Sequence, residues 1–89
     1  MLVKPNSIWF QDADKLTQWQ KLKKSGDFRA LASFQEDVLR ERDAWQFIAQ
    51  LTVKILDYEP ARNQVNVEMQ TTGRMAGTRW FLDTDALLK

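Results

Sequence analysis

The spacing of apolar residues changes partway along this 89-residue chain, and the change limits the folds open to it. In the first half, apolar residues recur at intervals of three and four, the spacing of a helix with one buried face. Near residue 50 the interval becomes two, and Val65, Val67 and Met69 alternate with polar neighbours as in a half-buried strand. Helices followed by strands, with no linker-like stretch between them, predict a single α+β domain over residues 1–89.

Capping residues place two helices in the first half of the chain. Asp12 is a favourable N-cap for the first helix, and Gly26 suits the left-handed residue that follows its end. Asp27 can cap a second helix, which would be about 33 Å long if it continued unbroken over residues 28–49. The segment Asp-Ala-Trp-Gln at 43–46 has the form of a capping box. We therefore expect that the second helix either breaks there or extends one end toward a partner.

The second half of the chain predicts three antiparallel strands. The first covers residues 51–58 with a slip in its alternation at 56–57, and a turn at 59–63 leads to the second strand at 65–69. The third covers residues 78–82, and Asp83 can cap a short helical turn after it. The expected fold is α+β, with two N-terminal helices packed on one face of a small three-stranded antiparallel meander and a short C-terminal helical turn.

The chain contains no cysteine and no histidine, which excludes several kinds of catalytic and metal site. A disulfide framework, a thiolate nucleophile, a Ser-His-Asp triad and a histidine zinc site are all impossible. Two Asp-x-Asp pairs, at 12–14 and 83–85, stand where helices are expected to begin, so capping accounts for them without a metal ion. We therefore expect no metal, no cofactor and no enzymatic activity.

The hydropathy of the chain favours a cytoplasmic protein that does not enter a membrane. No apolar run approaches the roughly 18 residues that a membrane span needs. The first ten residues also lack the apolar centre of a signal peptide, because Lys4, Pro5 and Asn6 interrupt it.

Small size, a high aromatic content and an incompletely covered sheet favour a protein–protein interaction module, such as an adaptor, an inhibitor or an assembly factor. In the expected meander, Phe81 lies on the face opposite Trp80, where it would meet solvent, a partner or a second copy. Rigid aromatic residues and arginines dominate interface hot spots. The predicted partner-binding residues are Trp9, Phe10, Arg74, Arg79 and Phe81, and we expect a homodimer.

Two other functions remain open at this level. A nucleic-acid-binding accessory protein would use the Arg74/Arg79 loop and the basic residues of and beside the first helix, which are Lys15, Lys21, Lys23, Lys24 and Arg29. The formal net charge of only +1 weakens that reading. An enzyme or small-ligand binder would instead need a pocket between the sheet and the helices.

Overall fold

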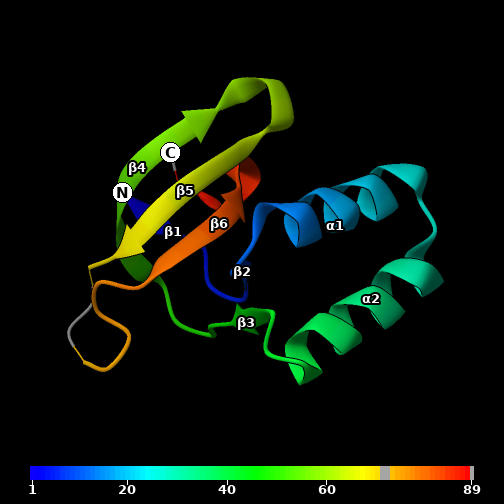
Figure 1. Ribbon diagram of the computed structural model, residues 1–89, viewed down its shortest axis with the longest axis horizontal. Helices are drawn as coiled ribbons and strands as arrows, with labels where there is room; N and C mark the ends of the chain where they lie inside the picture. Colours follow the sequence, from blue (N-terminus) through cyan, green and yellow to red (C-terminus); the bar gives the residue numbers. More distant parts are fainter. Residues whose placement is uncertain (71–72, 89) are drawn as a thin grey trace.

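The computed structural model describes residues 1–70 and 73–88, and it consists of a helical hairpin beside a curled antiparallel sheet (Figure 1). Along the chain the elements are β1 (Leu2–Val3), β2 (Ile8–Phe10), α1 (Ala13–Ser25), α2 (Phe28–Arg40), β3 (Ala44–Gln46), β4 (Leu51–Glu59), η1 (Pro60–Arg62), β5 (Gln64–Met69), β6 (Arg79–Asp83) and η2 (Thr84–Ala86). The α+β class and the two predicted helices are confirmed.

The predicted caps of the two helices are present. The Asp12 carboxylate accepts a hydrogen bond from the Lys15 backbone N–H at 2.9 Å, and Gly26, whose φ is +76°, follows the last residue of α1. Asp27 caps α2 in the same way, accepting from the Ala30 N–H at 3.0 Å. Each carboxylate satisfies an N–H group that the first helical turn would otherwise leave without a partner.

Of the two alternatives for the second helix, a break or an unbroken extension, the structure shows the break. The helix neither continues to residue 49 nor restarts at the capping-box sequence, because α2 ends at Arg40 and residues 44–46 form β3. Arg42 takes a left-handed conformation with φ +63°, and the Asp43 N–H donates to the Val38 carbonyl at 2.9 Å. This is a Schellman end, in which an arginine occupies the position that glycine usually takes.

The expected three-stranded meander is wrong, because the sheet has six strands in the order β1-β4-β5-β6-β2-β3. The predicted three-stranded meander forms one part of this sheet, β4-β5-β6. The predicted slip at Leu56 is a β-bulge between Ile55 and Asp57. The three additional strands contain two or three residues each, too few to display an alternating pattern. Pairing with distant parts of the chain, such as Phe10 with Phe81, makes them strands.

The sheet curls until its first strand meets the end of the chain. β1 pairs with β4 on one side, and on the other Val3 forms a bridge with Leu87. Two backbone hydrogen bonds of 2.8 Å flank this bridge, from Lys4 to Ala86 and from Leu88 to Leu2. The start and the end of the described chain therefore lie side by side (Figure 1).

The concave face of the sheet holds the larger hydrophobic core, which we call the inner core. Its fully buried members are Val3, Trp9, Val53, Val65, Val67, Met69, Trp80 and Leu82. Trp9, Phe47 and Trp80 meet edge to face, with ring centroids between 5.1 and 6.1 Å apart. Edge-to-face pairs bring the positive edge of one ring to the negative face of the next, which adds to the stability from burial alone.

The opposite face packs against the helices and forms a smaller core, which we call the helix-side core. Its fully buried members are Phe10, Leu16, Val38 and Ala44, with Phe81, Phe34 and Trp19 partly buried around them. A polar network joins the helices to the sheet beside this core. The buried Gln64 side chain donates to Thr17 Oγ1 at 2.8 Å and to Gln20 Oε1 at 3.1 Å.

Candidate functional site

The three aromatic residues predicted to bind a partner contribute to the two cores instead. Trp9 and Phe10 have 1% and 0% of their surface exposed, because β2 is an internal strand covered on both faces. Phe81 does lie opposite Trp80, as predicted, but it pairs with Phe10 beneath the helices rather than facing solvent. Trp9 and Phe10 are therefore closed to a partner in this conformation, and Phe81 is half-buried.

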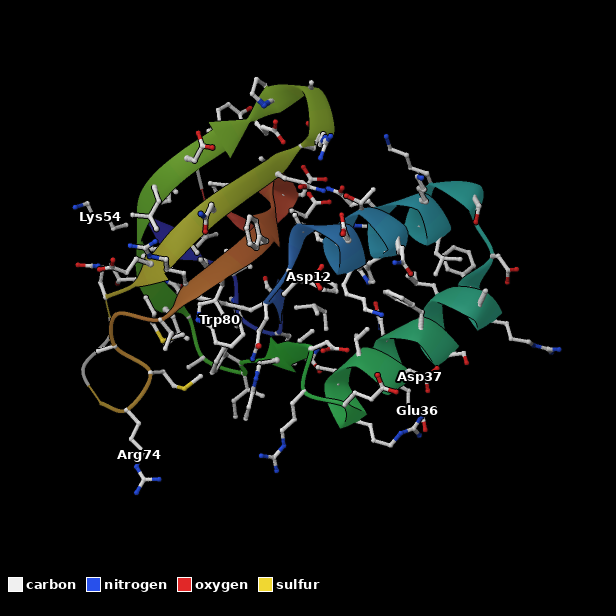
Figure 2. All side chains as sticks on the ribbon, in the orientation of Figure 1. Asp12, Glu36, Asp37, Lys54, Arg74 and Trp80 are labelled. Carbon is white, nitrogen blue, oxygen red and sulfur yellow. The ribbon has the colours of Figure 1, made fainter. Side chains whose placement is uncertain are left out.

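The two predicted arginines are at the surface. Arg74 lies in the loop between β5 and β6, and its side chain points away from the body of the protein (Figure 2). Arg79 is exposed at the start of β6, directly across from Glu68 of β5.

The basic residues around α1 lie in a mixed electrostatic environment. Four of them are exposed, namely Lys21, Lys23, Lys24 and Arg29, whereas Lys15 is half-buried. Lys23 Nζ sits 4.9 Å from the centre of the Trp19 ring, a cation–π contact within the molecule. Asp14, Asp83 and Asp85 line the same shallow hollows as these lysines, so the charge presented there is not of one sign.

Sequence reasoning missed the most distinctive surface, which is the outer edge of β4. β1 pairs with this edge only at Leu51 and Thr52, and the Val53 N–H donates to the Met1 carbonyl at 2.9 Å. Among residues 1–70 and 73–88, no strand pairs with the outer edge of β4 beyond that point. We call residues 54–59 the free edge, since their outward backbone groups can still accept a strand.

Apolar side chains are exposed along the free edge. Ile55 and Leu56 are each 37% exposed and Tyr58 is 55% exposed. Ile55 and Tyr58 lie on the inner face of the sheet, across from Val67 and Val65 of β5. Soluble proteins usually protect edge strands from pairing, so exposed apolar side chains on a free edge of this length mark a candidate docking site.

An open hollow of about 470 Å³ adjoins the free edge. It is lined mainly by apolar side chains from β4, β5 and the two chain ends, among them Met1, Ile55, Tyr58, Val65 and Leu87. Side chains of an added strand could enter this hollow from the edge.

Alternating charge runs along the other face of the sheet toward the same edge. Arg79, Glu68 and Lys54 are cross-strand neighbours on β6, β5 and β4. Lys54 ends this row at the free edge, where its side chain points outward (Figure 2). Glu59 stands at the other end of the edge, with Arg62 3.7 Å away.

One signal in the sequence pointed to this surface. The slip in alternation at 56–57 puts Leu56 out of phase with its neighbours, which marks a bulge. The slip alone did not identify a free edge, because the exposure of β4 depends on which strands lie beside it.

Two further properties bear on function. In the part of the chain that the structure describes, no three His, Cys, Asp or Glu residues gather in a way that could hold a metal ion. Neither α1 nor α2 combines the length and the apolar character that crossing a membrane requires.

Comparison of the chain with protein-family models, with curated proteins and with solved structures finds no match.

Proposed function

We propose that this protein is a small non-enzymatic interaction module that binds an extended segment of a protein partner along the free edge of β4. The observation that carries the proposal is that residues 54–59 combine an unpaired outer backbone with exposed Ile55, Leu56 and Tyr58. Strand addition of this kind takes its affinity from backbone hydrogen bonds and its specificity from pockets for alternate side chains. An adaptor, an inhibitor or an assembly factor of the cytoplasm could act in this way.

The chemistry of the edge indicates the segment it would take. An added strand would place alternate residues over Ile55 and Tyr58, beside the apolar hollow, and these should be apolar or aromatic. The residues that flank them would meet Lys54 at one end and Glu59 at the other, which favours an acidic residue opposite Lys54 and a basic residue opposite Glu59.

Capture from a native lysate, with a lysine introduced at the edge, tests the proposal. The wild-type chain and an Ile48→Lys control should retain the same proteins after nuclease treatment, because Ile48 is 82% exposed but lies outside β4. Ile55→Lys should lose them, since a charge facing inward at an edge opposes strand addition. Circular dichroism would verify that both variants fold. Equal capture by Ile55→Lys would contradict the edge as the binding site.

Nucleic-acid binding is a second candidate because cations from two elements converge. Lys21 and Lys24 of α1 and Arg62 of η1 line one hollow of about 400 Å³. Binding through such residues releases counterions and must weaken steeply with salt. Fluorescence anisotropy with a labelled oligonucleotide should then show loss of binding in Lys23→Glu/Lys24→Glu and at raised salt. Binding that is insensitive to salt between about 50 and 200 mM would contradict it.

A further inference from the structure

The free edge of β4 is complementary to itself, and we infer that a second copy of this chain adds to it as an antiparallel strand, centred between Leu56 and Asp57. The inference rests on the proposed function, because it names the partner of the same site. Four properties of the edge carry it: its length, its bulge, the direction of its backbone and its charges.

The length of the edge sets the centre of the pairing. Met1 occupies the outer edge at Val53, and Pro60 begins η1 at the other end, so six residues are free between them. Two copies related by a two-fold axis that pair along this whole edge must place the axis between its third and fourth residues. Ile55 then faces Tyr58 of the second copy, and Lys54 faces its Glu59.

The bulge makes this register sterically consistent. In a regular strand, Ile55 and Tyr58 would lie on opposite faces, since they are three residues apart. The extra residue at Leu56 restores both to the inner face, across from Val67 and Val65 of β5. A facing pair must share one face of the combined sheet, and Ile55 and Tyr58 now do so.

The backbone directions agree with the register. The Val53 N–H points outward to Met1, so the backbone of Ile55, two residues on, also points outward. Tyr58 pairs with Val65, two residues from the Val67 that pairs with Ile55, so its backbone is turned outward as well. Its N–H donates to Asp57 Oδ1 at 2.9 Å. Ile55 and Tyr58 of opposite copies would form hydrogen-bonded pairs, with the Asp57 carboxylate displaced from the Tyr58 N–H.

The charges complete a row across the two copies. Arg79, Glu68 and Lys54 already alternate in sign across three neighbouring strands. In the inferred register Glu59 of the second copy comes next, and the two-fold axis repeats the same pairing at the other end of the edge. Opposite charges directly across a strand pair stabilise it, and like charges destabilise it.

A reciprocal charge test examines this pairing in the full-length chain. Because a six-residue ladder buries little surface, association should be weak, and sedimentation from about 1 μM to about 1 mM should show the mass rising from 10.5 kDa toward twice that value. Lys54→Glu and Glu59→Lys should each weaken association about tenfold or more, since each variant places like charges opposite one another at both ends.

An equimolar mixture of the two charge variants should recover association, because every facing pair is then of opposite charge. Misfolding of a variant would not produce this mutual rescue. Lys21→Glu changes the net charge as Lys54→Glu does but lies on α1, and it should associate like the wild type. A mixture that stays monomeric would overturn the inferred register.

Cysteine pairing tests the register directly, since the chain has no cysteine of its own. Hydrogen-bonded antiparallel pairs have Cα atoms about 5.5 Å apart, within the range of a disulfide. A mixture of Ile55→Cys and Tyr58→Cys chains should form a disulfide-linked heterodimer under mild oxidation. A mixture of Lys54→Cys and Tyr58→Cys, which would face each other in a register shifted by one residue, should not. Linkage in that control mixture alone would overturn the inference.

The two proposals fail in different ways. A wild-type chain that stays at 10.5 kDa over the whole concentration range contradicts the second copy as partner. If Ile55→Lys nevertheless loses captured proteins that Ile48→Lys retains, the free edge binds another protein and the proposed function stands. If the chain is monomeric and Ile55→Lys captures as the wild type does, both proposals are wrong.

Discussion

The two faces of the sheet are stabilised by different means. The inner core contains eight fully buried apolar residues among those the structure describes, including two tryptophans in edge-to-face contact. The helix-side core contains four. Each helix contributes one of them, Leu16 from α1 and Val38 from α2. A polar network around Gln64 supplies further contacts on the helix side only.

This difference shows that stability need not be uniform in so small a protein. Segments with few buried apolar contacts open at lower free energy than the strands of a dense core. We therefore expect the helical hairpin to open before the sheet does, so that the free edge of β4 persists when the helices fluctuate.

Truncating the centre of the inner core should have the largest effect. Trp80 is 2% exposed, and its Nε1 donates to Thr78 Oγ1 at 2.7 Å. Trp80→Ala should lower the free energy of unfolding by about 3–5 kcal/mol, measured by urea denaturation. Trp80→Phe should lose clearly less, because a ring still meets Trp9 and Phe47. Equal losses in both variants would show that the ring contacts contribute little.

Removing the anchor of α1 should have a smaller and more local effect. Leu16→Ala should lower the stability by about 2–3 kcal/mol, since the helices border solvent and can settle into the space. Native-state hydrogen exchange should show the amides of α1 and α2 losing more protection than those of β5 and β6. A uniform loss across helices and strands would contradict independent opening of the hairpin.

The polar network around Gln64 should contribute about 1–2 kcal/mol to the free energy of unfolding. The effects of substituting its members should not be additive. Gln64→Leu removes the donor that both Thr17 and Gln20 accept from, and it leaves their oxygens without that partner. Adding Thr17→Val should then cost less than it does in the wild type, because the two residues share one hydrogen bond. Thermal unfolding of the four chains of this cycle measures the coupling, and strict additivity would argue against the network.

A substitution at the end of α2 should change the free energy of unfolding least, and it should raise that free energy rather than lower it. Arg42→Gly should raise the stability by about 0.5 kcal/mol, because glycine adopts the positive φ found there without steric strain. The gain is limited by loss of the contact between Arg42 and the Trp45 ring, 5.9 Å apart. Arg40→Gly, at the last residue of the same helix, should instead lower the free energy of unfolding, by up to about 1 kcal/mol. Destabilisation by Arg42→Gly would show that the ring contact dominates.

Local signals in the sequence predicted the parts of the fold that local interactions determine. Asp12 and Asp27 cap their helices as expected, and the slip at Leu56 is the bulge of β4. A break in the second helix was one of two alternatives, but its exact position was not predicted because an arginine, rather than a glycine, takes the left-handed position. The sequence carries no usual signal for that choice.

Long-range pairing explains the remaining errors. β1 and β3 are too short to show a period, and β2 becomes internal only because β6 and β3 pair with it from distant positions. The internal position of β2 buries Trp9 and Phe10, which we had predicted to bind a partner only because they are aromatic. The free edge was missed for the same reason, since the length that β1 covers cannot be read from β4 itself.

The position of β2 in the sheet also has a consequence for biosynthesis. β2 leaves the ribosome before its neighbour β6, which lies about seventy residues later in the chain, at Arg79–Asp83. Until β6 emerges, the nascent chain must carry the side chains of Trp9 and Phe10 without their final neighbours. Pairing of β2 with β6 thus waits until β6 has been synthesised, and the interval before it is when a chaperone would find these two aromatic residues.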